Sequence, residues 1–113
     1  MTRESKIQRD VQLALGSMPH VRLWRANVGL AIPVSQVCDD CRRRCRPVQF
    51  GVPGQADLTG IIGPVGRRLE VEVKSPTGSQ SEKQRRFQQM VEMRGGLYAV
   101  VRSVDDALRA IQA

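Results

Sequence analysis

The sequence predicts an α/β fold in which helices flank a central mixed β-sheet, with elements in the order α-β-β-β-α-β-α. Segments with apolar residues at helical spacing alternate along the chain with short runs of β-branched and aliphatic residues. At 113 residues the chain is long enough for one hydrophobic core and too short for two. We therefore expect a single domain over residues 1–113.

The N-terminal third is expected to hold a helix, one or two strands and a loop. Apolar residues such as Ile7 and Val11 recur at helical spacing over residues 3–15, which predicts an amphipathic helix. Residues 21–34 are rich in β-branched and aliphatic residues and predict one or two short strands. Residues 35–47 are polar and rich in cysteine and arginine, so we expect a loop or hairpin tip there.

The middle of the chain is expected to form a hairpin. Two extended runs, residues 56–62 and 67–74, are joined by the tetrapeptide Gly-Pro-Val-Gly at 63–66. Proline and glycine in this arrangement suit a turn between antiparallel strands.

The C-terminal third is expected to form helix, strand and helix. Ser79 and Glu82 have the spacing of a capping box, which predicts a helix from there to about Arg94. Residues 97–102 are apolar and predict a buried strand. Ser103 then caps a last helix that runs to the C-terminus.

The chain is basic, with 18 Lys and Arg against 11 Asp and Glu, which makes a polyanion the first partner to consider. Charge alone does not separate nucleic acid from a membrane surface. No stretch approaches the roughly 20 apolar residues that span a bilayer, and residues 1–6 lead into no signal-peptide core. We expect a soluble protein of the cytoplasm, with no membrane association.

The predicted hairpin carries acids in a pattern that suits a metal. Side chains alternate across a strand, so Glu70, Glu72 and Lys74 should share one face. Asp57, on the partner strand, can approach the same edge of the sheet. Neighbouring carboxylates repel one another unless a cation lies between them, and an oxygen-only site suits Mg²⁺ or Mn²⁺. Such an ion holds a phosphate oxygen and activates water, with Lys74 close to the reacting groups.

A plainer interpretation is a solvated strand face with ordinary cross-strand ion pairs. Two observations favour the metal site. Asp57 comes straight after a glycine-rich bend at residues 51–56, and the whole chain is basic. Phosphodiester cleavage needs both a metal held by carboxylates and a positive surface that attracts the backbone.

These motifs resemble a known family. Asp57 followed by Glu72-Val73-Lys74 is similar to the D…(D/E)-x-K core of the PD-(D/E)XK nuclease superfamily, and in particular to the VRR-NUC domains. The likeness extends over nearly the whole chain. Further segments similar to family motifs are Arg25-Ala26-Asn27-Val28-Gly29, Phe50-Gly51-Val52-Pro53-Gly54, Ser81-Glu82-Lys83-Gln84 and the closing run from Gly95 to Ser103.

The resemblance implies a restriction-endonuclease-like fold and a set of site residues. Asp57, Glu72 and the carbonyl of Val73 would be the ligands of Mg²⁺ or Mn²⁺. Lys74 would be the catalytic lysine, and Gln84 would lie beside the catalytic site and orient it.

Three further positions bear on the resemblance. Glu4 matches an acid that members often point at the metal, although an acid on an exposed helix face is more often only solvated. Ala56 stands where many members have proline directly before the acid, a change that removes no chemical group. Glu70 has no role in the family motif and is treated as a flanking acid.

The resemblance also implies an activity. Small stand-alone phage members are similar to structure-selective nucleases, including homodimers that resolve four-way (Holliday) junctions. We expect a metal-dependent endonuclease that cuts DNA, with branched or structured DNA as substrate, in a bacterial or phage-infected cell. A non-catalytic nucleic-acid-binding module and a ribonuclease of the same fold are the alternatives, because phosphate contacts do not report the sugar.

Three cysteines in the 35–47 loop raise the question of zinc. Cys38, Cys41 and Cys45 are close enough in sequence to bind one ion, with His20 as a conceivable fourth ligand. A second C-x-x-C pair is missing, so reduced thiols in a polar loop are the alternative. A structural Zn²⁺ site is the weaker expectation.

Two groups of basic residues are candidate phosphate contacts, because guanidinium groups match phosphate geometry. One lies in the 35–47 loop and the other in the first turns of the helix after the hairpin. The four aromatic residues of the chain are expected in the core. The basic groups are Arg42, Arg43, Arg44 and Arg46, and Lys83, Arg85 and Arg86; the aromatic residues are Trp24, Phe50, Phe87 and Tyr98.

Overall fold

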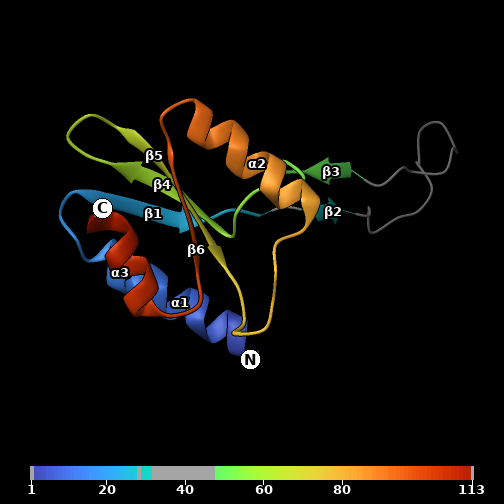
Figure 1. The fold of residues 1–113 in the computed structure, drawn as a ribbon, viewed down its shortest axis with the longest axis horizontal. Coiled ribbons are helices and arrows are strands. Elements are labelled where there is room, and N and C mark those ends of the chain that lie inside the picture. Colours follow the sequence, from blue (N-terminus) through green and yellow to red (C-terminus); the bar gives the residue numbers. More distant parts are fainter. Residues whose placement is uncertain (1, 28, 32–47, 113) are drawn as a thin grey trace, which may run out of the picture.

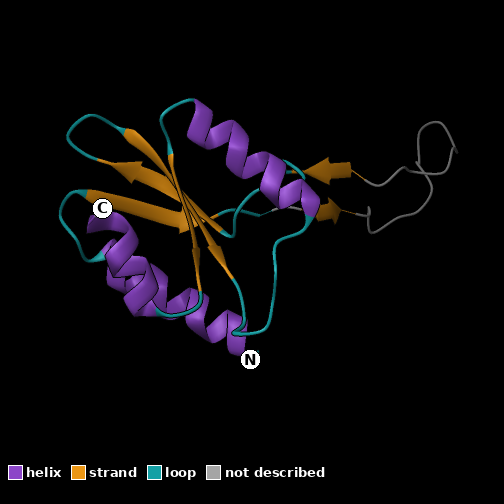
Figure 2. Cartoon of the chain, in the orientation of Figure 1, coloured by secondary structure: helices purple, strands orange, loops and turns teal. Residues whose placement is uncertain are grey.

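Figure 1 shows the computed structural model of the chain, which describes residues 2–27, 29–31 and 48–112. A β-sheet lies between two helical layers, with α2 on one side and α1 and α3 on the other (Figures 1 and 2). This arrangement confirms the predicted α/β class, a mixed sheet flanked by helices.

The three strands of the main sheet that precede α2 match the predicted order. Two further strands, β2 and β3, are three residues each and pair antiparallel with one another in a separate two-stranded sheet. β2 lies within residues 21–34, where one or two short strands were predicted, whereas β3 was not expected, because three residues are too few for the alternation that marks a strand in sequence. The elements are α1 (Arg3–Gly16), β1 (Val21–Arg25), β2 (Gly29–Ala31), β3 (Val48–Phe50), β4 (Leu58–Ile62), β5 (Arg67–Val73), α2 (Glu82–Met93), β6 (Leu97–Val101) and α3 (Val104–Gln112).

The main sheet has the strand order β1-β4-β5-β6. The β4–β5 pair is antiparallel, as the turn at residues 63–66 predicted. The β1–β4 pair is also antiparallel, and the β5–β6 pair is parallel. A parallel pair needs a crossover connection, and α2 provides it. In the resulting register Thr59 lies between Trp24 of β1 and Glu70 of β5, and Glu70 lies beside Tyr98 of β6.

The two faces of the sheet bury different side chains. The face toward α1 and α3 carries the main core, which includes Leu58, Leu69 and Val71 from the sheet and Val11 and Leu15 from α1. The face toward α2 carries a smaller cluster, formed by Ala56, Phe87, Val91 and Tyr98. Because side chains alternate along each strand, the residues between those of the main core necessarily face α2.

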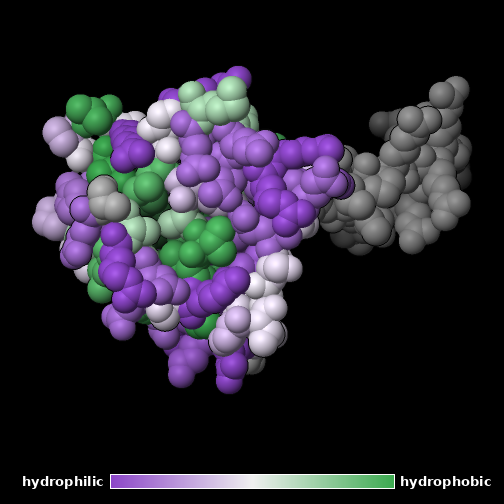
Figure 3. All heavy atoms as spheres, viewed as in Figure 1, coloured by the Kyte–Doolittle hydropathy of each residue, from purple (hydrophilic) through white to green (hydrophobic). Residues whose placement is uncertain are grey.

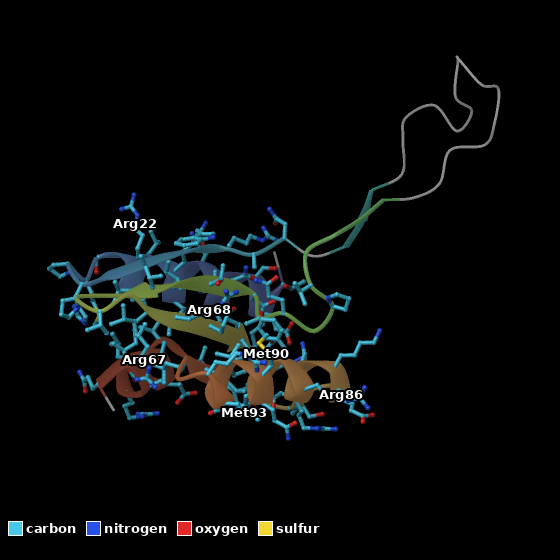
Figure 4. The ribbon with its side chains drawn as sticks, turned by 90° about the horizontal axis from the view of Figure 1, so that it is seen from above. Arg22, Arg67, Arg68, Arg86, Met90 and Met93 are labelled. Atoms are coloured by element: carbon cyan, nitrogen blue, oxygen red, sulfur yellow. The ribbon has the colours of Figure 1, made fainter. Side chains whose placement is uncertain are left out.

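The expectation that all the aromatic residues lie in the core is wrong for Trp24. Phe87 and Tyr98 are buried against each other, with ring centroids 6.4 Å apart. Trp24 is 47% exposed, because α2 lies over β5 and β6 and leaves the same face of β1 uncovered (Figure 4). Phe50 is in β3, and its side chain is outside the described part of the structure.

The predicted capping box of α2 is shifted by two residues. Ser81, not Ser79, is the N-cap, and its side chain accepts a hydrogen bond from the Gln84 amide. In return the Gln84 side-chain oxygen accepts one from the Ser81 amide, 2.8 Å away. Glutamine closes a capping box as glutamate does. Residues 81 and 84 therefore fit the capping-box pattern as well as residues 79 and 82, and the sequence alone does not distinguish the two pairs.

Figure 3 shows one face of the molecule, on which hydrophilic residues dominate and hydrophobic residues gather over the middle, where Figure 1 places β6. Among the described helices, none is long and apolar enough to cross a membrane.

Candidate active site

The glycine-rich bend before β4 positions Asp57 against α2. Gly54 has φ +83°, a conformation that residues with a Cβ rarely adopt. A Cβ at this position would lie 2.5 Å from the carbonyl oxygen of Lys83, so the bend approaches the first turn of α2 as closely as backbone allows. Ala56 is buried in the cluster beneath α2. The bend therefore fixes the distance between Asp57 and the start of this helix.

Asp57 lies where β4 and β5 meet at one end of the sheet. Its Oδ2 accepts a hydrogen bond from the amide of Val73, 2.8 Å away, and its carbonyl oxygen accepts one from the amide of Ala26. The carboxylate thus contacts the last residue of β5, and the backbone of Asp57 contacts the residue that follows β1.

Glu72 is almost entirely buried at the same end of the sheet, with 2% of its surface exposed. Its Oε1 accepts a hydrogen bond from Nε2 of Gln84 at 2.9 Å and lies 3.8 Å from Nζ of Lys74. Its Oε2 accepts one from the hydroxyl of Tyr98 at 3.3 Å. Both carboxylate oxygens are therefore held by α2 and β6.

Gln84 joins the helix cap to this acid. Its side-chain oxygen is taken up by the Ser81 amide, which leaves the NH₂ group directed at Glu72. The residue that closes the capping box therefore also orients a carboxylate of the site.

Burial and charge disturb the ionisation of Glu72. The pKa of its carboxyl group is raised to about 7, because burial and the negative charge of Asp57 raise it by more than Lys74 and the hydrogen bond from Tyr98 lower it. Burial and the neighbouring Glu72 also raise the pKa of the Tyr98 hydroxyl well above its usual value. A cation between the two acids would relieve this repulsion, and two carboxylates form the hard oxygen donor set that Mg²⁺ or Mn²⁺ prefers. The residues present therefore fit such an ion.

The described part of the chain contains no group of three or more His, Cys, Asp or Glu side chains that could hold a metal ion. A cation here would accordingly draw on two carboxylates, backbone oxygen and water. Glu4 lies near the site without joining these acids. Its Oε1 accepts a hydrogen bond from the amide of Ser75, directly after Lys74, at 3.0 Å.

Glu70 is fully buried and lies outside the pair formed by Asp57 and Glu72. Its Oε1 accepts hydrogen bonds from the Thr59 hydroxyl and from Nε of Arg68, both at 2.7 Å. Its Oε2 has no hydrogen-bond partner among the described residues. Because Glu70 and Glu72 are both buried, the interpretation of this stretch as a solvated strand face is wrong.

A cavity of about 530 Å³ opens beside Asp57. It is lined by Gln8 of α1, by Arg25 and Asn27 at the end of β1, and by Gln55 of the bend. The structure thus brings the Arg-x-Asn stretch next to the first acid of the D…E-x-K pattern, although more than 25 residues separate them in the sequence.

The predicted basic contacts are described only in part. Lys83, Arg85 and Arg86 are exposed in the first turns of α2, where Arg85 donates to the Gln80 carbonyl and Arg86 pairs with Glu82. His20 lies in an exposed turn before β1. The predicted contacts and zinc ligands Cys38, Cys41, Arg42, Arg43, Arg44, Cys45 and Arg46 are outside the described residues.

Sequence reasoning missed Tyr98 as part of the site. Tyr98 was expected only in the core. Nothing in the sequence of an apolar strand indicates that the hydroxyl of its tyrosine contacts an acid on the neighbouring strand. The β5–β6 register, which brings its ring beside Glu70 and under α2, is what reveals the contact with Glu72.

Comparison with known proteins identifies the family. The family model of the VRR-NUC domain matches residues 3–105. The chain belongs to the VRR-NUC family. The VRR-NUC domain is a nuclease-type domain of the PD-(D/E)XK superfamily, so the resemblance in the sequence motifs is confirmed. In general terms a VRR-NUC domain is an endonuclease, and therefore a hydrolase.

The fold is also similar to a solved VRR-NUC domain. The two chains are 22% identical in sequence and superpose with a TM-score of 0.60. The match covers 99% of this chain and 97% of the other. At this identity the comparison supports the fold alone. No curated protein matches this VRR-NUC domain significantly.

Proposed function

We propose that this VRR-NUC domain is an endonuclease that depends on Mg²⁺ or Mn²⁺ and hydrolyses phosphodiester bonds of DNA. One observation carries the proposal: the buried carboxylate of Glu72 lies at the same sheet end as Asp57, with the ammonium group of Lys74 beside it. Two acids brought together where water is scarce repel each other, and a divalent cation offsets that repulsion.

Asp57, Glu72 and the carbonyl of Val73 are the groups that would hold the ion. When bound, the ion neutralises phosphate charge and lowers the pKa of a water molecule. Gln84 and Tyr98 restrict Glu72 to one orientation, because each holds one carboxylate oxygen. Glu4 is a candidate additional acid, at present engaged by the Ser75 amide.

Lys74 is the proposed catalytic cation. Attack on a phosphodiester adds negative charge to the phosphate oxygens, and a fixed positive group in a partly buried site stabilises that charge more than one in water. The Lys74 side chain is only 16% exposed and is held near Glu72, so its charge is fixed at the sheet end where the phosphate must lie.

The preferred substrate is proposed to be branched or structured DNA, attracted by the net charge of +7. One site cuts one strand, so the symmetric cutting of a four-way junction requires two copies of the chain, and we propose a homodimer for that reaction. The basic residues of the 35–47 loop and of the first turns of α2 are proposed phosphate contacts. A structural Zn²⁺ on the three cysteines remains a weaker proposal.

The test incubates the purified protein with a supercoiled plasmid, a labelled four-way DNA junction and the RNA junction of the same sequence, each with Mg²⁺, Mn²⁺ or EDTA. We expect metal-dependent cutting of DNA. Glu72→Gln and Lys74→Ala should each lower the rate by about a hundredfold or more, because each removes a charge that acts on the phosphate.

Glu92→Gln is the matched control, since it makes the same change at an exposed acid of α2 and should cut at the wild-type rate. Cutting that persists in EDTA or in Glu72→Gln would refute the proposed site. Preferential cutting of the RNA junction would move the activity to ribonuclease, and symmetric cutting by a species that sediments as a monomer would exclude the dimer.

A further inference from the structure

The α2-facing side of the sheet is covered over only half its width. Phe87 and Val91 of α2 pack against Tyr98 of β6 and the bend before β4. In Figure 4, α2 lies over one side of the sheet, and Arg22 of β1 projects beyond it on the other side. The part of this face formed by β1 and β4 is therefore open to solvent.

Four exposed side chains define this open face. Arg22, Ile61 and Arg68 follow one another across β1, β4 and β5 in one row of the register, and all three are exposed. In the next row of the register Trp24 of β1 lies beside Thr59 of β4, which lies beside Glu70 of β5. Trp24 is 47% exposed. We call Arg22, Trp24, Ile61 and Arg68 the open sheet face.

The open sheet face adjoins the site. Trp24 and Glu72 project from the same side of the sheet. Their neighbours in the chain, Leu23 and Val71, both face the main core on the other side, and side chains alternate along a strand. Only β4 separates their strands, so at the usual strand spacing and rise the two side chains are on the order of 12 Å apart. The indole ring is therefore within reach of a nucleotide next to a phosphate bound at Glu72.

Charge and chemistry indicate the occupant. A half-exposed indole two residues along β1 from the exposed Arg22, with Arg68 two strands away in the row of Arg22 and paired with Glu70, combines a stacking surface with a cation that attracts a phosphate backbone. Tryptophan and arginine are also enriched at protein interfaces, so the composition of the face alone does not decide between a protein and a nucleic acid. The net charge of +7 favours nucleic acid.

We propose that the open sheet face binds unpaired nucleotides next to the scissile phosphate, with Trp24 stacking on a base. Stacking needs a base face that is free of its own neighbours, which duplex DNA does not offer in its interior. This inference rests on the proposed nuclease function and deepens it, since it assigns the preference for branched or single-stranded substrates to a particular side chain.

Trp24 is the only tryptophan of the chain, so intrinsic fluorescence reports on it alone. The test titrates the wild-type protein, in EDTA to prevent cutting, with a short oligothymidylate and with a blunt duplex, and follows Trp fluorescence beside the anisotropy of labelled nucleic acid. We expect strong quenching by the single strand and little by the duplex. Binding without quenching, equal quenching by the duplex, or no binding of the single strand would overturn the inference.

Variants separate stacking from folding. Trp24→Ala should weaken binding of the single strand about tenfold, and Trp24→Phe should restore most of the affinity because an aromatic ring is kept. Val65→Ala, at an exposed apolar residue in the turn at the far end of the hairpin, should bind as wild type. Circular dichroism and urea denaturation check that each variant is folded.

Two further outcomes are informative. If Trp24→Ala abolishes a dimer in sedimentation and leaves nucleic-acid affinity unchanged, the open sheet face is a contact between copies and the inference is wrong. Because the titration needs no cleavage, stacking can be observed even if the metal-dependent cutting fails, and a failure of stacking leaves that cutting intact.

Discussion

The buried carboxyl group of Glu72 makes the metal-free protein less stable as the pH rises. Its pKa is raised from an ordinary value of 4.5 to about 7 in the folded chain. Between these values the folded state binds a proton that the unfolded state has released, so the free energy of unfolding falls with increasing pH. Below about pH 4.5 the group has no effect on this slope, and above about pH 7 the loss is complete.

The size of the effect follows from the two pKa values. A difference of one pKa unit corresponds to about 1.4 kcal/mol, so the rise from 4.5 to about 7 gives a loss of about 3 kcal/mol between pH 4.5 and pH 8. This is a large part of the 5 to 15 kcal/mol that typically stabilises a domain, on the order of one third. A divalent cation bound between Glu72 and Asp57 would offset most of it.

Urea denaturation in EDTA at pH 5 and pH 8 measures the loss, with Glu72→Gln as the reference. The variant has no carboxyl group to titrate at this position, so its stability should change with pH by about 3 kcal/mol less than that of the wild type. Mn²⁺ added at pH 8 should restore most of the free energy of unfolding that the wild type loses between pH 5 and pH 8. It should leave the stability of the variant unchanged. Identical pH dependence of the two proteins in EDTA would refute the reasoning that Glu72 is destabilised by burial and by Asp57.

The remaining predictions concern stability and can be checked by urea denaturation at pH 7. Gly54→Ala should cost about 3 kcal/mol, because its Cβ would meet the α2 backbone, whereas Gly66→Ala, with a similar positive φ and open space, should cost only about 1 kcal/mol. Ser81→Ala should cost about 1 kcal/mol through the lost N-cap and Ser79→Ala almost nothing; the reverse order would contradict the observed cap. Arg68→Ala removes the guanidinium from the fully buried acid of β5 and should cost about 2 kcal/mol, and an unchanged midpoint would show that this ion pair does not stabilise the fold.

The main sheet and its helices could be predicted because each has a strong local pattern. The alternation in β5, the turn at residues 63–66 and the apolar spacing in α1 each identify an element without reference to the rest of the chain. β3 and its pairing with β2 could not be predicted in the same way, because a strand of three residues has no period to detect. Their pairing depends on contacts between residues about 20 positions apart.

The candidate site was predicted as a set of residue types, and its connections were not. Asp57, Glu72 and Lys74 stand out because acids and a lysine interrupt apolar strands. The hydrogen bonds to Glu72 come from a helix cap and from β6, and a single sequence does not report which donors reach it. The exposure of Trp24 was missed for a related reason, since the width of sheet that α2 covers is set by three-dimensional packing.

The β4–β5 register has a consequence for how faithfully this protein folds. If β5 paired one residue out of step, Glu70 and Glu72 would turn into the apolar layer beneath α1 and α3, and Leu69 and Val71 would turn toward α2. Burying two acids without donors would cost more than the misaligned sheet could gain. The acids thus act against mispairing during folding, so molecules that reach the native core also have their reactive groups assembled, and a folded but misassembled population is not expected to accumulate.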